Sequence, residues 1–457
     1  MTLEAKNVLV VGSGKSGIAA VKLLLKAGAN PCLLDGNKEL TEDILREKIG
    51  EVALGENQSL SFAIGEMTKE QEQVLDYVVL SPGVPTDKDF VNRLRAKGLP
   101  ILGEIELAYL FEKGNVLAIT GTNGKTTTTT LLGEIMKRHA EKTFVVGNIG
   151  NPYTDEVQGT DAGSVTVAEI SSFQLETIHT FAPAVSAILN ITPDHLDRHH
   201  TMENYVAAKE AIAGNQTKEQ FCVLNYEDSY TREFAQRCSA TPILFASAHE
   251  LEDGFYYKDE CIYKAVSGTS EKLMNIHEMA LLGIHNVENV MAAIAMADAY
   301  QVPMDTILDT VRSFKAVEHR IEYVATKNGV DYYNDSKGTN PDAAIKAIQA
   351  MVKPTYLIGG GYDKQSSYDE WIESFDGKVQ ALVLLGQTAE KIAACAKAHG
   401  FANCVLVDSL QEAVDYCSAH ATQGQAVLLS PACASWGMFP NYEVRGNMFK
   451  DMVHALK

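Results

Sequence analysis

Residues 121–126 (GTNGKT) are the strongest candidates for chemistry in this chain. They follow the apolar run 115–120 and precede a helical pattern, which is the layout of a phosphate-binding loop. Glycines let backbone N–H groups surround a polyphosphate, and the start of a helix adds positive potential. We expect Lys125 to contact the terminal phosphates and the Thr126 hydroxyl to bind Mg²⁺. The loop is a variant, because Ile119 stands where the general pattern has its first glycine, and a turn that caps a helix is the alternative.

A second glycine-rich segment lies near the N-terminus. Residues 12–17 (GSGKSG) fit the pattern GxGxxG between a strand-like run and a helical pattern, and Asp35 follows Gly17 by 18 residues. This layout is typical of a dinucleotide-binding unit. The residues alone leave three interpretations open: a nicotinamide dehydrogenase, a site for a nucleotide-sugar diphosphate with Asp35 near the uracil or ribose, and a structural tight turn.

Acidic, basic and imidazole side chains provide further candidates. Glu169 ends an apolar strand and can hold Mg²⁺ or cap the next segment. The segment 194–200 contains three histidines, but its spacing lacks the further ligands of a zinc site, and a helix-start turn is the alternative. Lys209 lies in NYVAAKEAI, where spacing alone predicts a solvated helix lysine.

Two candidates lie farther along the chain. Asn286 and Asn289 share one face of a predicted helix, where they could hydrogen-bond a purine edge or serve as a cap and a satisfied amide. Arg320 lies near a predicted domain boundary and could hold phosphates during domain closure.

These residues must be positioned by alternating strands and helices, which predict α/β domains with doubly wound sheets. A chain of 457 residues fits about three domains. We place them at residues 1–112, 113–316 and 317–457, with hinges near 112–115 and 313–320. The expected strands are 7–12, 31–35, 77–80, 100–102, 115–120, 165–170, 185–191, 330–335, 355–360, 381–386, 404–408 and 426–430, with small antiparallel strands around 250–275.

Composition excludes several classes of function. The formal net charge of -20 argues against nucleic acid and anionic membranes as partners, but not against small anions bound by local groups. Eight scattered cysteines without a CxxC pair favour free thiols in a reducing compartment. The sequence shows no signal-peptide layout and no apolar run near the ~20 residues that span a bilayer. We therefore expect a cytoplasmic protein, and a monomer.

Taken together, the motifs resemble the ATP-dependent Mur ligases over nearly the whole chain. The resemblance rests on GTNGKT, EISSFQLE, LNITPDHLDRH, YVAAKEAI, GIHNVENV, EHRIE and NDSKGTNP. GSGKSG with Asp35, together with LLSPACASWGMF, is most similar to the members that add D-glutamate. Members that add L-lysine or diaminopimelate usually carry a DNPR-type segment, where this chain reads GGGYDKQSSY.

The resemblance implies a fold and a reaction. The fold would be a Rossmann-like N-terminal domain that binds a UDP-sugar, a central P-loop ATPase domain, and a Rossmann-like C-terminal domain that binds the amino acid. ATP would phosphorylate the carboxylate of UDP-N-acetylmuramoyl-L-alanine, and the amine of D-glutamate would attack the acyl phosphate. This is a cytoplasmic step of peptidoglycan precursor synthesis, and it uses two Mg²⁺ ions to offset charge repulsion.

The resemblance also assigns roles to residues. The catalytic set is Lys125, Glu169, His195 and Lys209. The metal ligands are Thr126, Glu169, His195 and Lys209, the last of which carries CO₂ as a carbamate. The ATP set is Gly121, Thr122, Asn123, Gly124, Lys125, Thr126, Thr127, Asn286, Asn289, Arg320 and Asp335. The UDP-sugar set is Gly14, Lys15, Ser16, Asp35, Gly83, Asn148 and His195, and the D-glutamate set is Lys337, Thr339, Lys364, Ser435 and Tyr442.

Three alternatives to this interpretation are an oxidoreductase that uses the N-terminal glycines, a non-catalytic ATP-binding switch, and a Mur ligase that adds a different amino acid. The oxidoreductase would leave the phosphate loop and NDSKGTN without a role.

Overall fold

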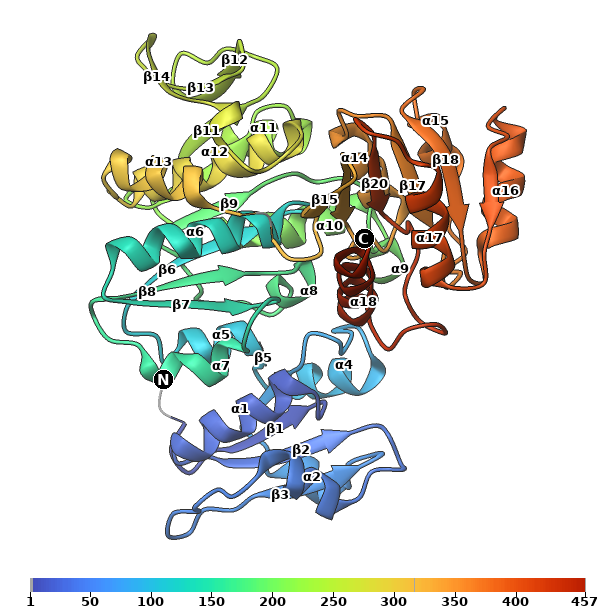
Figure 1. The fold of residues 1–457 in the computed structure, drawn as a ribbon. Helices are drawn as coiled ribbons and strands as arrows, with labels where there is room; N and C mark the ends of the chain where they lie inside the picture. The colour runs from blue at the N-terminus through green and yellow to red at the C-terminus, as the bar shows by residue number, and fades with distance from the viewer. Residues whose placement is uncertain (1–2, 316, 457) are drawn as a thin grey trace. The chain divides into compact units, whose positions relative to one another are not determined.

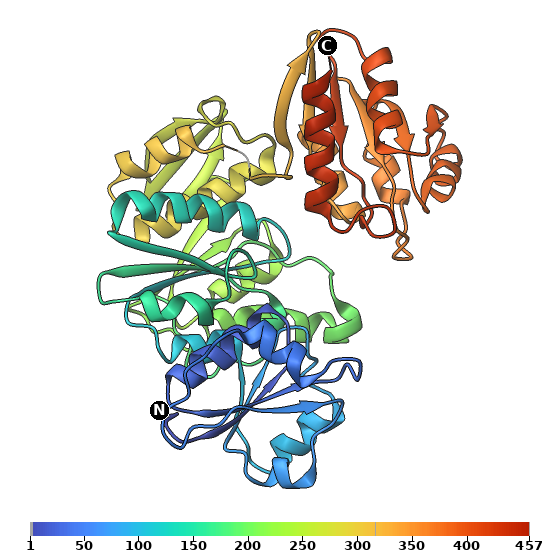
Figure 2. The same ribbon diagram turned by 60° about the horizontal axis from the view of Figure 1, so that its bottom comes forward.

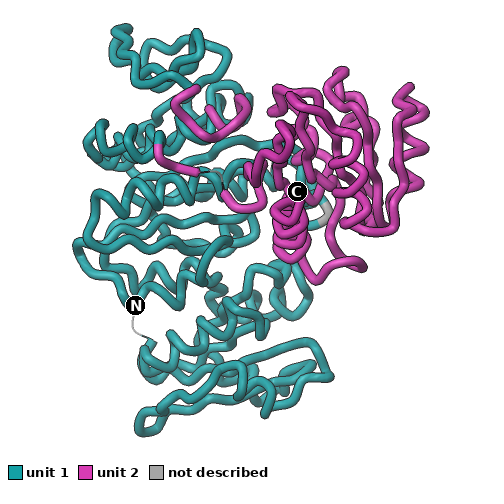
Figure 3. Tube along the Cα trace, in the orientation of Figure 1, with its two compact units in different colours: residues 1–276, 288–312 teal, residues 277–287, 313–457 magenta. Residues whose placement is uncertain are grey.

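The computed structural model describes residues 3–315 and 317–456, which form three α/β sheets in two compact units. The first unit holds the chain up to Ile276 together with Glu288–Arg312, and the second holds His277–Val287 and the chain from Ser313 onward (Figure 3). Among the described residues, no helix has the length and apolar character needed to cross a membrane.

The N-terminal sheet has the strand order β3-β2-β1-β4-β5, and its strand pairings are parallel (Figure 1). Its strands are β1 (Asn7–Val11), β2 (Asn30–Asp35), β3 (Ser61–Ile64), β4 (Tyr77–Leu80) and β5 (Ile101–Gly103), and its helices are α1 (Lys15–Lys26), α2 (Glu42–Ile49), α3 (Lys69–Gln73), α4 (Asp89–Ala96) and α5 (Glu104–Tyr109).

Alternation along β1 explains why helices cover both faces of this sheet. Val8 and Val10 pack in one core with residues of α1, whereas Leu9 and Val11 pack in another with residues of α4. Successive strand residues point to opposite faces, so a strand that is apolar throughout requires a cover on each side. The doubly wound layout predicted for this region is therefore confirmed (Figure 2).

The central sheet has the order β14-β13-β12-β11-β10-β9-β6-β8-β7. Its strands are β6 (Asn115–Thr120), β7 (Lys142–Gly147), β8 (Ser164–Glu169), β9 (Val185–Ile188), β10 (Phe221–Asn225), β11 (Thr241–Ala246), β12 (Gly254–Lys258), β13 (Cys261–Val266) and β14 (Thr269–Asn275). Its helices are α6 (Lys125–His139), α7 (Tyr153–Glu156), α8 (Ser172–Leu175), α9 (Leu196–His199), α10 (Met202–Glu210), α11 (Ser229–Ala235), α12 (Ile284–Ala299) and α13 (Met304–Ser313), with 3₁₀ turns η1 (Val157–Gly159), η2 (Ala211–Ala213) and η3 (Ile276–Glu278). The antiparallel pairing of β12, β13 and β14 confirms the small strands expected around residues 250–275.

One continuous core joins the first two sheets. Residues of α1, α5 and α7 pack in the same apolar cluster as residues of β6 and β8. The predicted hinge at residues 112–115 lies beside this core. Hydrogen bonds of Glu112 anchor the hinge segment to its surroundings. Its carboxylate accepts hydrogen bonds from the Tyr153 hydroxyl at 2.7 Å, the Thr166 hydroxyl at 2.9 Å and the backbone N–H of Gly114 at 2.8 Å.

The sheet of the second unit has the order β15-β16-β20-β17-β18-β19, with β15 antiparallel at one edge. Its strands are β15 (Glu322–Lys327), β16 (Val330–Asn334), β17 (Thr355–Gly359), β18 (Val379–Leu384), β19 (Cys404–Leu406) and β20 (Ala426–Leu429), and its helices are α14 (Pro341–Ala350), α15 (Asp369–Glu373), α16 (Ala389–Ala398), α17 (Leu410–His420) and α18 (Tyr442–Ala455). Residues of α14 and α16 pack on one face and residues of α17 and α18 on the other, so this sheet is also covered on both sides.

Candidate nucleotide and substrate sites

The loop Gly121–Gly124 connects β6 to α6, as the sequence predicts. Gly121 and Gly124 have φ values of 151° and 86°, which side chains disfavour. A Cβ atom on Gly124 would also lie 2.1 Å from Oδ1 of Asn289, so this backbone conformation and the adjacent amide require glycine. Asn289 therefore lies against the loop, and its contact with a nucleotide stays a prediction.

Contacts from other segments anchor the loop. The N–H of Asn123 donates to Oδ1 of Asn190 at 2.8 Å, and Nδ2 of Asn190 donates to the Asn123 carbonyl at 3.1 Å. The hydroxyls of Thr122 and Tyr205 lie 3.0 Å apart. Among the described residues, no side chain caps the start of α6, where Thr126 and Thr127 are buried. Such a helix start suits an anionic ligand.

Two lysines share the first carbonyl of the loop. Nζ of Lys125 and Nζ of Lys209 each donate to the Gly121 carbonyl oxygen at 2.8 Å. Lys209 is only 1% exposed, so its interpretation as a solvated helix lysine is wrong. Burial, and then the charge of Lys125, hold the pKa of Lys209 well below its usual value. This environment favours a neutral amine at Lys209 or an anionic group beside it.

Glu169 ends β8 beside the strand that leads into the loop, because Ile119 of β6 is its register partner. Its side chain is 1% exposed, and its Oε1 accepts a hydrogen bond from Nδ2 of Asn148 at 2.8 Å. Within the described residues, Oε2 is buried without a hydrogen-bond partner. A buried, half-satisfied carboxylate is costly unless a cation binds it.

The histidine segment divides into an exposed and a buried part. His195 has a φ of 53° and is exposed, and its ring meets the Phe173 ring in an edge-to-face arrangement with the two ring centres 4.8 Å apart. His199 is buried, its Nε2 lies 2.9 Å from the Ser172 hydroxyl, and burial lowers its pKa. In the described part of the chain, these histidines do not join a zinc-like group of three His, Cys, Asp or Glu ligands.

Arg198 is a residue that the sequence interpretation missed. Its guanidinium donates to the carbonyls of Pro82 at 3.0 Å and Val84 at 3.2 Å, to Glu176 at 2.8 Å, and stacks 4.2 Å from the Phe173 ring centre. It thereby joins the loop after β4, which contains the predicted site residue Gly83, to the central sheet.

We predict that Arg198→Ala lowers the free energy of unfolding by about 3 kcal/mol, because Glu176 would keep a largely buried charge without its cation. Urea unfolding followed by circular dichroism measures this. Arg46→Ala is the matched control, since its pair with Glu42 is exposed and such pairs contribute about 0.5 kcal/mol or less. Equal losses in the two variants would contradict the structural role of Arg198.

The N-terminal glycine loop is organised by Asp35. Its Oδ2 accepts from the N–H and hydroxyl of Ser13 at 2.8 and 2.6 Å, and its Oδ1 accepts from the N–H of Asn37 at 2.9 Å. Partial burial opposes ionisation, but these hydrogen bonds outweigh it and lower the Asp35 pKa. A Cβ on Gly17 would lie 1.8 Å from the Gly12 carbonyl oxygen, which explains this glycine. Lys15 and Ser16 begin α1 after Gly14, where Gly14 and Lys15 are exposed.

In the second unit, Asp335 directly follows β16 and is buried. Its Oδ2 accepts from the Ser430 hydroxyl at 2.7 Å, and burial raises its pKa to about 7. Nε of the nearby Arg320 is buried without a hydrogen-bond partner among the described residues. A side chain on Gly338 would meet Oδ2 of Asp335 at 2.4 Å, so this glycine keeps the carboxylate accessible to its partners.

The raised pKa of Asp335 gives a pH-dependent stability. Between about pH 4 and pH 7 the unfolded chain releases the proton while the folded state keeps it, so this group makes the free energy of unfolding fall as pH rises. We predict that the stability difference between wild type and Asp335→Asn changes by about 2 kcal/mol from pH 5 to pH 7. Tryptophan fluorescence in urea measures it, since Trp371 and Trp436 both lie in this unit.

The control for that experiment is Asp331→Asn in the same sheet. The Asp331 carboxylate pairs with Nζ of Lys353 at 2.5 Å. Burial acts to raise the pKa of Asp331, but hydrogen bonds from Lys353 and Thr326 outweigh burial and lower it. The contribution of Asp331 to the free energy of unfolding is therefore lost only as pH falls below the ordinary carboxylate range. The stability difference between wild type and Asp331→Asn should stay constant from pH 5 to pH 7. An equally flat difference for Asp335→Asn would refute the raised pKa.

The residues predicted to bind D-glutamate lie in two separate places in the second unit. Nζ of Lys337 lies 5.5 Å from the ring centre of Tyr442, and Nζ of Lys364 lies 5.4 Å from that of Trp436. Ser435 is buried and lines a small cavity of about 10 Å³ with Arg445. Thr339 donates its N–H to the Lys337 carbonyl at 2.9 Å.

Arg445 was not found from the sequence. It is buried and donates to the hydroxyl of Ser336 at 2.9 Å, to the Ser336 carbonyl at 2.8 Å and to the Cys433 carbonyl at 3.3 Å. It therefore fixes the segments that carry Lys337 and Ser435. Asn286 donates to the Leu282 carbonyl at 2.7 Å, an intrasegment contact of the kind its alternative interpretation predicts.

The chain matches Mur ligase domain families along most of its length. Residues 6–103 match the Mur ligase MurD-like N-terminal domain, residues 119–297 the Mur ligase middle domain, and residues 319–433 the Mur ligase glutamate ligase domain. The matched segments fall inside the predicted domains, and the boundaries at residues 112 and 316 stay predictions.

Curated relatives and solved structures agree with these matches. UDP-N-acetylmuramoylalanine--D-glutamate ligases of Lachnoclostridium phytofermentans and Lachnospira eligens are each 57% identical over 457 residues, covering 100% of both chains. Among solved structures, UDP-N-acetylmuramate-alanine ligase MurC from Thermotoga maritima has a TM-score of 0.59 at 19% identity, with 98% of this chain and 99% of that chain covered. A pseudomurein peptide ligase type C from Methanothermus fervidus has a TM-score of 0.57 at 16% identity, with 99% and 100% covered, and shares the fold. The chain therefore belongs to the Mur ligase family of enzymes.

Proposed function

We propose that the chain is the ATP-dependent ligase that adds D-glutamate to UDP-N-acetylmuramoyl-L-alanine, a cytoplasmic step of peptidoglycan precursor synthesis. The observation that carries this proposal is the 57% identity, over the full length of both chains, to relatives named for that reaction. The geometry around Gly121 and the lysines of the second unit support it.

The phosphate loop would bind ATP through its backbone and through Lys125. The start of α6 supplies N–H groups and positive potential, while Lys125 can leave the Gly121 carbonyl for the terminal phosphate. The substrate carboxylate would attack the γ-phosphorus, forming a carboxylate–phosphorus bond and releasing ADP. The amine of D-glutamate would then attack the acyl carbon, and phosphate would leave with its bonding electrons while the amine loses a proton.

The residues present fit Mg²⁺. Hydroxyl and carboxylate oxygens are the ligands that this ion prefers, and the buried Oε2 of Glu169 lacks a partner among the described residues. Thr126 and Glu169 would hold one ion, and His195 and a modified Lys209 the other. When bound, Mg²⁺ reduces the repulsion between the substrate carboxylate and the γ-phosphate.

The modification proposed at Lys209 is a carbamate. Burial holds the pKa of Lys209 well below its usual value, which favours the neutral amine with its lone pair available. Its nitrogen would form a bond to the carbon of CO₂ and release a proton, which converts a cationic group into an anionic one. The burial that disfavours the ammonium form thus favours the chemistry that the family resemblance implies.

The two remaining sites take the UDP-sugar and D-glutamate. The glycine loop with Asp35, Lys15, Ser16 and Gly83 would hold the uridine diphosphate, and Asn148 and His195 would face the sugar peptide. A cleft of about 700 Å³ adjoins this region, lined in part by Gly36 and Gly65 after β2 and β3. Lys337 and Lys364 suit the two carboxylates of D-glutamate, with Thr339, Ser435 and Tyr442 completing the set.

The decisive experiment measures ADP release in the presence of UDP-N-acetylmuramoyl-L-alanine and ATP. We expect turnover with D-glutamate and none with L-lysine, diaminopimelate or L-alanine. Turnover with one of the other amino acids and not with D-glutamate would overturn the proposal, and ADP release that needs no amino acid would favour an ATPase instead.

A further inference from the structure

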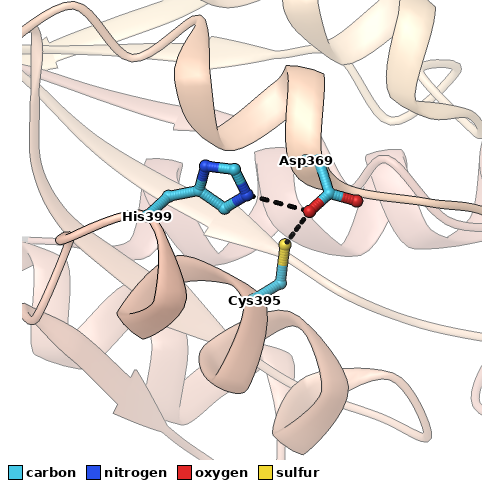
Figure 4. Close-up of side chains that lie close together, drawn as sticks. All are labelled: Asp369, Cys395 and His399. Carbon is cyan, nitrogen blue, oxygen red and sulfur yellow. Dashed lines mark hydrogen bonds and ion pairs between the residues drawn. The ribbon is translucent and has the colours of Figure 1, made fainter.

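A group of metal-ligating side chains lies outside the sites described above, on two neighbouring helices of the second unit (Figure 4). Asp369 and Glu373 are four residues apart on α15, and Cys395 and His399 are four residues apart at the end of α16. Side chains with this spacing lie on one face of a helix. The two helices therefore present one pair each to a common point.

The distances at that point suit a single metal ion. Nε2 of His399 lies 2.8 Å from Oδ1 of Asp369, and Sγ of Cys395 lies 3.6 Å from the same oxygen. All three ligand atoms lie within 4.8 Å of one another. Zinc bonds of about 2.0 to 2.3 Å in a tetrahedron place ligand atoms about 3.3 to 3.8 Å apart, so binding requires only small side-chain shifts.

A fourth side chain orients the imidazole. Nδ1 of His399 lies 3.3 Å from Oε1 of Glu373, so the ring presents Nε2 to Asp369 and Cys395. Metal-bound histidines in proteins use this arrangement, in which the second ring nitrogen donates to a carboxylate.

The donor atoms indicate which metal fits. One thiolate, one imidazole and one carboxylate suit zinc and similar borderline ions, whereas Mg²⁺ prefers oxygen donors alone. The Asp369 side chain is largely exposed, which gives an ion access and leaves room for a water ligand. Burial, together with the charge of Asp369, raises the pKa of Cys395, so the thiol keeps its proton until a metal displaces it.

We propose that Asp369, Cys395 and Nε2 of His399 form a binding site for one zinc-class divalent cation, with Glu373 as a positioning residue. On binding, a metal–sulfur bond forms and the thiol releases its proton to solvent. The site links α15 to α16, so metal stabilises the second unit by binding the folded state. It does not depend on the ligase activity proposed above.

Cobalt binding tests the proposal, because a cobalt–thiolate bond gives a charge-transfer absorption that oxygen and nitrogen ligands do not. The full chain is titrated with Co²⁺ in excess Mg²⁺, which occupies the oxygen-rich sites. We expect one equivalent of Co²⁺ to produce the band, Zn²⁺ to remove it, and Cys395→Ser to abolish it. Cys404→Ser, a half-buried thiol of the same unit, should leave it unchanged.

Two further variants keep the test decisive if Cys395→Ser misfolds. His399→Gln changes a partly exposed residue and should shift and weaken the band. Glu373→Gln should weaken Co²⁺ binding by about 10-fold to 100-fold while preserving the thiolate band, as expected for a residue that acts through the imidazole. Absence of the band in the wild-type chain, or its persistence in Cys395→Ser, would overturn the proposal.

Discussion

Replacement of Lys209 by alanine should lower ligase turnover by about a thousandfold while the protein stays folded. The amine lies in the interior beside the phosphate loop and donates to the Gly121 carbonyl. If it carries a carbamate, the substitution removes a metal ligand. If it remains an amine, the substitution removes only a buried hydrogen-bond donor to the Gly121 carbonyl.

A labelling experiment separates these two roles. The wild-type chain equilibrated with ¹³C-bicarbonate should show a carbamate resonance that is absent in Lys209→Ala, and removal of CO₂ should lower wild-type activity reversibly. Lys137→Ala on the exposed face of α6 is the control, and it should retain both the carbamate resonance and the dependence of activity on CO₂. Normal turnover in Lys209→Ala would sink the carbamate assignment, and unchanged activity without CO₂ would leave Lys209 as a simple donor.

The second large effect is expected for Lys125→Ala. Its ammonium lies at the start of α6. There it can stabilise the negative charge that develops on the phosphoryl group during transfer. We expect kcat to fall by about 10²-fold to 10³-fold, which is the loss typical of removing one electrostatic donor from a transition state. The loop backbone should persist, because Asn190 and Tyr205 anchor it independently of this side chain.

Steady-state kinetics with ATP as the varied substrate measures this effect. Lys125→Arg should recover part of kcat, since it restores charge without the same reach. If Lys125→Ala raised only the KM for ATP and left kcat unchanged, the lysine would contribute to binding in the ground state and not to phosphoryl transfer.

The phosphate loop could be predicted because its signal is local. Strand, glycines, lysine and hydroxyl are consecutive, and each residue type has a physical reason at its position. The burial of Lys209 could not be read from spacing, because it depends on packing α10 against a loop 88 residues earlier. Only the resemblance to the family assigned that lysine a role.

Arginines with backbone partners escaped prediction for a related reason. Arg198 and Arg445 bind main-chain carbonyls of distant segments, and every residue type offers such a carbonyl. Among the strands, β3, β7 and β15 lie at sheet edges, where one or both faces tolerate polar residues, and they were missed. The interior strands β10 and β11 were missed as well, although β10 is largely buried. The buried central strands β1, β6 and β20 were placed to within a residue.

The apolar cluster that spans α1, α5, α7 and the central strands also limits how this chain can be recombined. A nucleotide-binding module joined by a mere linker can be exchanged for another or expressed as a fragment. Here a cut at residue 112 would leave Ile105 and Leu107 of α5, both fully buried, without the partners that cover them. The N-terminal sheet and the first strands of the central sheet must therefore change together in any chimaera, as two halves of one folding unit.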